Sequence, residues 1–115
     1  MIIANFIKTI KLEISKRENP DIIFLVADRK TKKPKLDEEI IVRMDKEICE
    51  LFNRKNMKLI ELTKNSKRII DKCDGVMTTE EICKEIYKGF LLNKFTEDSV
   101  IFLDKLSKEK FITWK

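Results

Sequence analysis

The residue types that carry most enzyme chemistry are scarce in this sequence. It contains no histidine, so acid–base work would fall on carboxylates, lysines or Tyr87. No nucleophile stands beside a recognisable base, and the acidic clusters at 37–39 and 80–81 are ordinary surface pairs. With only Gly75 and Gly89, the chain has no glycine-rich phosphate loop. The sequence therefore predicts a protein that is not an enzyme.

Cysteine is the remaining residue type that could hold a metal or an iron–sulfur cluster. Cys49, Cys73 and Cys83 are odd in number, and their spacing matches no zinc motif. Structural zinc usually takes four sulfur or imidazole ligands, which three cysteines without histidine do not supply. We expect three small core or near-surface thiols in a reducing compartment, with no metal and no cofactor.

Length and composition indicate a globular chain with one modest core. It has 115 residues, of which 43% are apolar and 39% are charged. The sequence has no apolar run long enough to span a membrane. Its first residues lack the basic start and the cleavage site of a secretory signal. The expected location is therefore the cytoplasm, with no membrane partner.

The positive charge is concentrated near the N-terminus. Residues 1–34 carry eight lysines or arginines against four acids, whereas residues 35–115 carry seventeen against sixteen. A nucleic-acid-binding protein would need a concentrated cationic face on the later, motif-bearing part of the chain. The distribution argues against nucleic acid as a partner.

Residues 1–34 are predicted to form an N-terminal extension in front of a domain at 35–115. Residues 2–14 fit either a helical face or an alternating strand, whereas the short β-rich run at 21–27 predicts a strand. A basic linker completes the extension. Segments this apolar are expected to be ordered, either by extending the same core or as a homodimer contact through residues 1–30.

Three short apolar segments joined by polar turns predict an antiparallel meander. The strands are expected at residues 40–44, 48–52 and 57–62. The second turn contains asparagines, which adopt left-handed backbone angles more readily than most residues. The sheet should therefore be built from strands that are neighbours in sequence.

Helical spacing replaces strand spacing after residue 62. A first helix is expected over residues 64–73, with Gly75 as its left-handed stop. Thr78 and Glu81 form a capping-box pattern for a second helix, which is expected to end near Gly89. The apolar residues that this second helix should bury are Ile82, Ile86 and Phe90.

A third helix and a short tail complete the predicted fold. The helix is expected to begin after Thr96, with acidic residues in its first turn. Its buried face should consist of Phe102, Leu103 and Leu106. The tail at 111–114 should close the fold as a short strand or turn. The predicted class is α+β and winged-helix-like: a three-stranded meander followed by three helices, with an N-terminal extension.

One side of the third helix carries an apolar residue between lysines. At about 100° per residue, Ile101 points roughly 160–180° away from the buried face, with Lys105 and Lys108 beside it. Ile101 is either a singly exposed isoleucine, which is common, or part of the wall of a groove. Such a groove would suit an acidic, partly apolar peptide.

The third strand is the natural second wall of that groove. If it lies at the edge of the sheet, its amides and carbonyls can pair with an extended peptide. The alternative is an ordinary edge that Lys58 and Glu61 protect from further pairing.

The order of elements over residues 35–115 resembles the PqqD-like family, whose members are also called RiPP recognition elements. That family tends to have Leu-Asn before the first helix, where this chain has Leu62-Thr63. Asp74-Gly75 matches the Asp-Gly after that helix, and the segment 78–82 matches Thr-x-x-Glu-Ile. The segment 100–114 fits the family's ending.

The resemblance implies a function for the two walls. In that family, the leader segment of a ribosomally made precursor peptide joins the sheet along the third strand, beside the third helix. The residues that would form this site here are Met57, Lys58, Leu59, Ile60, Glu61, Ile101, Lys105 and Lys108. The resemblance also implies a modifying enzyme as partner, often a radical S-adenosylmethionine (radical SAM) protein, which would hold any iron–sulfur cluster itself.

Two other classes remain open from the sequence. A DNA-binding winged-helix regulator would have the same order of helices, but Arg68 is the only arginine in the helical region. A structural or assembly subunit would use the apolar N-terminal segments to dock on a partner enzyme or on a second copy.

Overall fold

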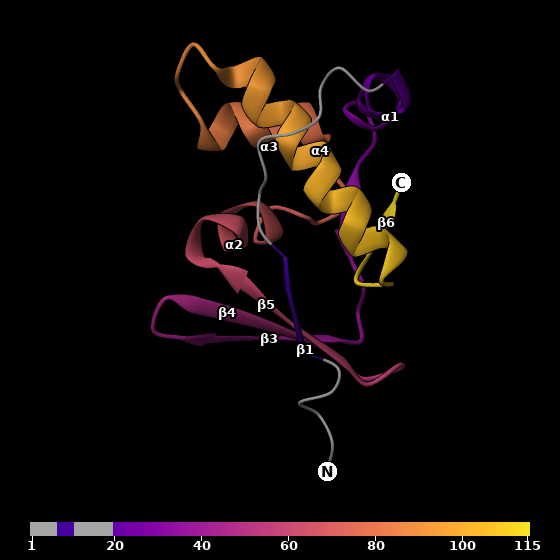
Figure 1. Cartoon of the computed structure of the whole chain (residues 1–115), viewed down its shortest axis with the longest axis vertical. Coiled ribbons are helices and arrows are strands. Elements are labelled where there is room, and N and C mark those ends of the chain that lie inside the picture. The colour runs from indigo at the N-terminus through magenta and orange to yellow at the C-terminus, as the bar shows by residue number, and fades with distance from the viewer. Residues whose placement is uncertain (1–6, 11–19) are drawn as a thin grey trace.

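The computed structural model describes residues 7–10 and 20–115 (Figure 1). Its described strands are β1 (Ile7–Ile10), β2 (Pro34–Leu36), β3 (Ile40–Asp45), β4 (Ile48–Asn53), β5 (Lys58–Thr63) and β6 (Ile112–Trp114). Its described helices are α1 (Pro20–Arg29), α2 (Lys64–Ile70), α3 (Thr79–Ile86) and α4 (Leu92–Lys108). The larger sheet forms one layer and the helices lie on one side of it, so the fold is α+β.

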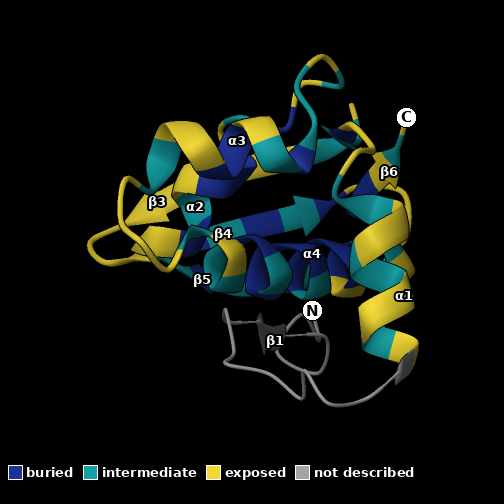
Figure 2. Ribbon diagram, turned by 90° about the horizontal axis from the view of Figure 1, so that it is seen from above, coloured by how far each residue is buried: buried dark blue, intermediate teal, exposed yellow. Residues whose placement is uncertain are grey.

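β3, β4 and β5 form the antiparallel meander that the sequence predicts. They pair along their full lengths, with Val42, Leu51 and Ile60 in one row across the sheet. Alternation places Cys49, Leu51, Ile60 and Leu62 in the buried core, beneath the helices (Figure 2). Because the meander is followed by α2, α3 and α4, the winged-helix-like prediction is confirmed.

A fourth strand lies along the outer side of β5. β1 pairs with β5 in parallel, from Ile7 opposite Leu59 to Ile10 opposite Leu62. The order of the sheet is β1-β5-β4-β3, so β5 is an interior strand here and not a free edge. Of the two interpretations of residues 2–14, the strand is correct for residues 7–10, and the rest of that segment lies outside the described residues.

A second, two-stranded sheet joins β2 to β6. The pairing is antiparallel, with Pro34 opposite Trp114 and Leu36 opposite Ile112. The end of the predicted linker is therefore a strand: β2 pairs with β6 on one side, and its backbone forms hydrogen bonds with the turn after α2 on the other. Leu36 donates its N–H to the Cys73 carbonyl at 3.0 Å, and the Pro34 carbonyl accepts from Gly75 at 3.0 Å. The open question about the tail is settled in favour of a strand.

Helix α1 replaces the strand predicted at 21–27. Its partly buried positions recur at helical spacing: Ile22, Leu25, Val26 and Arg29. Proline is well suited to the start of a helix, where Pro20 stands. α1 packs on α4, and the Arg29 guanidinium lies 5.7 Å from the centroid of the Trp114 ring. The strand prediction fails because a short apolar run fits either structure, and packing on α4 decides between them.

α2 begins directly where β5 ends. Thr63 caps it, accepting a hydrogen bond from the Ser66 N–H at 3.2 Å. The helix ends at Ile70 and not at Cys73: the N–H groups of Lys72 and Cys73 donate to carbonyls three residues back, in tighter turns than those of an α-helix. Gly75 has a positive φ of 80°, in agreement with its expected left-handed conformation.

α3 ends earlier than predicted. It stops at Ile86, because Tyr87 takes an extended conformation and its ring stacks on Phe95 with centroids 5.2 Å apart. Ile82 is buried as predicted and Ile86 is partly buried. Phe90 is 95% exposed, so its predicted burial is wrong. It lies beyond the end of the helix, where the helical spacing no longer applies.

α4 begins earlier than predicted. Its first residue is Leu92, and Thr96 lies inside the helix. The Thr96 hydroxyl donates to the Leu92 carbonyl at 2.9 Å, so it does not cap the helix. The predicted buried face is correct, since Phe102, Leu103 and Leu106 all lie in the core. Among the described helices, none is both long and apolar enough to cross a bilayer.

The capping box at the start of α3 is present as predicted. The Thr78 hydroxyl accepts from the Glu81 N–H at 3.2 Å, and the Glu81 carboxylate accepts from the Thr78 N–H at 2.8 Å. The hydrogen bond from the Thr78 backbone, with a second from its side chain, holds the pKa of Glu81 below its ordinary value.

Replacing Glu81 should change how the stability of the protein depends on pH. Because the folded-state pKa of Glu81 is lowered, its ionised form stabilises the fold above the ordinary glutamate pKa of about 4.3. That contribution is lost as pH falls through the lowered value. Glu81→Gln keeps an acceptor but does not titrate, so its free energy of unfolding should fall less steeply in acid.

Urea unfolding of both chains across this pH range measures the difference. Glu85→Gln, which removes a carboxylate from the same helix but outside the capping box, is the matched control. Equal acid sensitivity of Glu81→Gln and the unchanged chain would contradict the assignment.

Candidate functional site

The five candidate residues around β5 point in different directions. Ile60 is fully buried in the core, whereas Leu59 and Glu61 lie half-buried on the opposite face of the sheet. Lys58 is half-buried at the start of the strand. Met57 precedes the strand, in the turn, and has a positive φ of 63°. A peptide lying along β5 would therefore meet the backbone of Ile60 but not its side chain.

The three candidate residues on α4 lie on its less buried side, as predicted. Ile101 is half-buried, and Lys105 and Lys108 are exposed. The Lys108 ammonium lies 3.3 Å from the carboxylate of Asp104, one turn earlier. This side therefore combines an apolar contact with cationic groups, which is the character expected of a groove wall.

The strand and the helix meet where β5 starts and α4 ends. The Lys58 ammonium lies 2.6 Å from the carboxylate of Glu109, the residue that follows α4. Beside this ion pair is a hollow of about 420 Å³. Its lining residues are Asp37, Asn53, Lys55, Asn56, Lys58, Lys108 and Lys110. Four lysines and one aspartate line this hollow, hereafter the lysine hollow. Three of its ammonium groups already lie beside carboxylates: Lys55 beside Asp37, Lys58 beside Glu109 and Lys108 beside Asp104. An acidic group placed there would compete with these ion pairs. The lysine hollow brings Lys58 and Lys108 together. Ile101 and Lys105 lie earlier in α4 and do not line it.

A buried asparagine holds this junction together. Asn53, which is 1% exposed, ends β4. Its amide nitrogen donates to the Lys110 carbonyl at 2.9 Å, and its amide oxygen accepts from the Lys55 N–H at 2.8 Å. The Lys110 backbone has a positive φ of 70°, which turns the chain from α4 towards β6. One side chain thus joins the β4–β5 turn to the turn after α4.

Sequence reasoning missed Asn53 as part of the site. The available signal was its position, because it shares the core face of β4 with Cys49 and Leu51. A polar residue at a core position requires partners for its hydrogen-bonding groups. Those partners lie in turns that are distant in sequence, so their identity could not be inferred locally.

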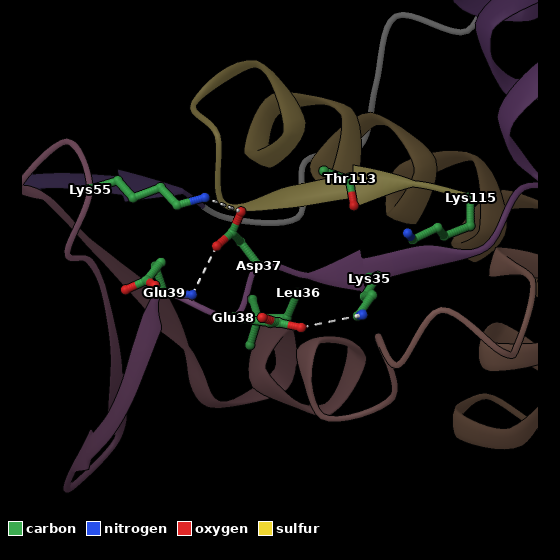
Figure 3. Close-up of a pocket in the computed structure, with 8 residues that line it drawn as sticks. All are labelled: Lys35, Leu36, Asp37, Glu38, Glu39, Lys55, Thr113 and Lys115. Carbon is green, nitrogen blue, oxygen red and sulfur yellow. Dashed lines mark hydrogen bonds and ion pairs between the residues drawn. The ribbon is translucent and has the colours of Figure 1, made fainter.

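A second hollow, of about 200 Å³, lies beside the two-stranded sheet (Figure 3). Its lining residues are Lys35, Leu36, Asp37, Glu38, Glu39, Lys55, Thr113 and Lys115. The Asp37 carboxylate accepts from the Glu39 N–H at 2.8 Å and lies 3.5 Å from the Lys55 ammonium. The Glu39 hydrogen bond holds the pKa of Asp37 below its ordinary value. Three lysines and three acidic residues line this hollow, so it has no excess of cationic side chains to favour an acidic ligand.

The cysteines are buried core thiols, as predicted. Cys49, Cys73 and Cys83 are all free and buried. Burial raises the pKa of each thiol, that of Cys73 to about 12, so little reactive thiolate is present near neutral pH. Within the described residues, no group of three or more Cys, Asp or Glu side chains is arranged to hold a metal ion.

Removing the Asn53 amide should loosen the junction. Asn53→Ala removes the buried amide that joins the Lys110 carbonyl to the Lys55 N–H, so we expect the free energy of unfolding to fall by about 1–3 kcal/mol. Asn56→Ala is the matched control, since Asn56 is exposed and accepts only a local hydrogen bond from Lys58. Urea unfolding measures both. Equal losses of unfolding free energy in the two variants would show that the burial of Asn53 does not determine its contribution to stability.

The comparisons with known proteins give a likeness of fold. No family model matches the sequence, and no curated protein matches it either. The structure matches a solved structure of TbiB1 in complex with the TbiA(beta) leader peptide, with a TM-score of 0.59 and 17% sequence identity. The match covers 68% of this chain and 93% of that chain. About two thirds of this chain therefore shares its fold with a protein whose solved structure contains a leader peptide.

Proposed function

We propose that this protein binds the leader segment of a ribosomally made precursor peptide and presents it to a modifying enzyme. The observation that carries the proposal is the likeness of its fold to TbiB1, whose solved structure contains a leader peptide. In our proposal the leader lies extended along β5, beside α4. The site comprises Met57, Lys58, Leu59, Ile60, Glu61, Ile101, Lys105 and Lys108.

The form of β5 supports this mode of binding. Addition of a strand to a sheet takes its affinity from backbone hydrogen bonds and its selectivity from side-chain contacts. β5 pairs with β1 on its outer side, so its backbone on that side is suitably arranged for an added strand. The core fixes Ile60 and Leu62, so β5 loses little conformational freedom when a partner binds.

The lysine hollow supports an acidic leader. Lys58 and Lys108 line it together with Lys55 and Lys110, at the point where the proposed strand site meets α4. An acidic residue of the leader placed there would meet several ammonium groups. The hollow would therefore fix both the preferred charge of the peptide and its position along β5.

The protein itself is non-catalytic in this proposal. Its sequence has no histidine, and burial raises the pKa of its three thiols. The chemistry would belong to the partner enzyme, which we propose to be a radical SAM protein.

Isothermal titration with the precursor peptide tests the function directly. The probe is the short acidic peptide encoded nearest to this protein in its genome. We expect a Kd in the micromolar range or below, equivalent to about 8 kcal/mol or more of binding free energy. Binding should be lost when the leader half is removed. Failure to bind, together with salt-sensitive retention of duplex DNA, would favour a winged-helix regulator instead.

Charge reversal on α4 tests the site. Lys105→Glu with Lys108→Glu should weaken binding of the acidic leader by about tenfold, because exposed charges each contribute up to about 1 kcal/mol. The control is Lys84→Glu with Lys88→Glu, which makes the same charge change on or just after α3. Lys84 lines a hollow near the other end of α4, with Leu92 and Asn93. Equal weakening by both pairs would indicate a general charge effect and no localised site.

A further inference from the structure

The place proposed for the leader is already taken by a segment of the same chain. β5 has two sides on which its backbone can pair. β4 pairs along one side over all six residues of β5, and β1 pairs along the other from Leu59 to Leu62 (Figure 1). A peptide strand that pairs directly with β5 therefore requires the residues that β1 now occupies. The two cannot bind β5 at the same time.

The pairing of β1 is of a kind that a longer strand can replace. It is short and parallel, whereas the other pairs in this sheet are antiparallel. Parallel pairing is slightly less stable per residue than antiparallel pairing. Within the described residues, the register of β1 covers Leu59–Leu62, four of the six residues of β5. An extended antiparallel peptide could pair along all six residues of β5, as β4 does on its other side.

The position of Lys58 adds to this advantage. Lys58 is the first residue of β5 and also lines the lysine hollow. A longer ligand strand could therefore pair as far as the hollow and place an acidic residue in it. The described pairing of β1 starts at Leu59, the next residue of β5.

We propose that β1 is an internal competitor, a resident strand that covers β5 until the leader peptide displaces it. This inference rests on the proposed function, because it concerns the regulation of the same site. Only chains in which β1 has left β5 can bind the leader. The apparent Kd is therefore the intrinsic Kd divided by the fraction of chains in this open state. Release of β1 would then accompany loading of the peptide.

A reversible tether between β1 and β5 tests the competition. Thr9 and Glu61 are register partners, so Thr9→Cys with Glu61→Cys in the full chain should form a disulfide on oxidation. The native thiols are buried, so they should not interfere. The ligand is a synthetic peptide that copies the leader half of the precursor named above. We expect the oxidised variant to bind it at least about tenfold more weakly than the reduced variant, because the tether removes the open state.

Two further variants complete the experiment. Thr9→Cys alone is the control, since it cannot form the tether and its affinity should not respond to oxidation. Thr9→Pro, which disturbs β1 without touching β5, should bind the leader more tightly than the unchanged chain. Equal affinity of the oxidised and reduced tethered forms would overturn the proposal. So would a disulfide that links two chains, because β1 would then come from a second copy.

The outcomes separate this inference from the function beneath it. If every variant binds the leader with the same affinity, the peptide-binding function is supported, and the proposal that β1 competes with the leader is contradicted. If neither the unchanged chain nor Thr9→Pro binds the leader, the proposed function itself fails.

Discussion

The buried side-chain amide of Asn53 holds the start of β5 against the end of α4. Its two hydrogen bonds reach the Lys55 backbone in one turn and the Lys110 backbone in another. A buried amide is tolerated only when its polar groups are paired, so both turns must keep their positions for the fold to be stable. The Lys58–Glu109 ion pair and the lysine hollow lie at this same junction. The geometry of the proposed site therefore depends on a residue that no ligand need touch.

Local patterns in the sequence predicted the local parts of the fold correctly. Alternation located the meander, and the Thr78–Glu81 spacing located the start of α3. The two wrong predictions before the meander share one cause, which is that long-range packing decided the outcome. α1 is a helix because one of its faces packs on α4, and the three residues of β2 form a strand because β6 and the turn after α2 supply partners. Such pairings between distant short segments leave little trace in the sequence.

The candidate site was predictable to a similar degree. Helical geometry placed Ile101, Lys105 and Lys108 away from the core, and strand order singled out β5. The sequence could not show that Lys58 and Lys108 share one hollow, since that depends on how the last turn of α4 meets the start of β5. Nor could it show that residues 7–10 pair with β5, because a four-residue parallel strand has no local signature.

The two sides of the meander differ in ways that explain why a partner strand belongs on β5. β3 forms the other outer strand among the described residues, and most of it is exposed, including Arg43 and Asp45. β5 also carries two charged residues, Lys58 and Glu61, so the two strands differ in burial and not in charge. β5 is instead held by the core through Ile60 and Leu62, so its backbone is ordered before any partner arrives. An ordered backbone edge also favours unwanted association between copies. In our proposal β1 protects this edge from association between copies. Because β1 is short and its pairing is parallel, it can still be exchanged for a longer ligand.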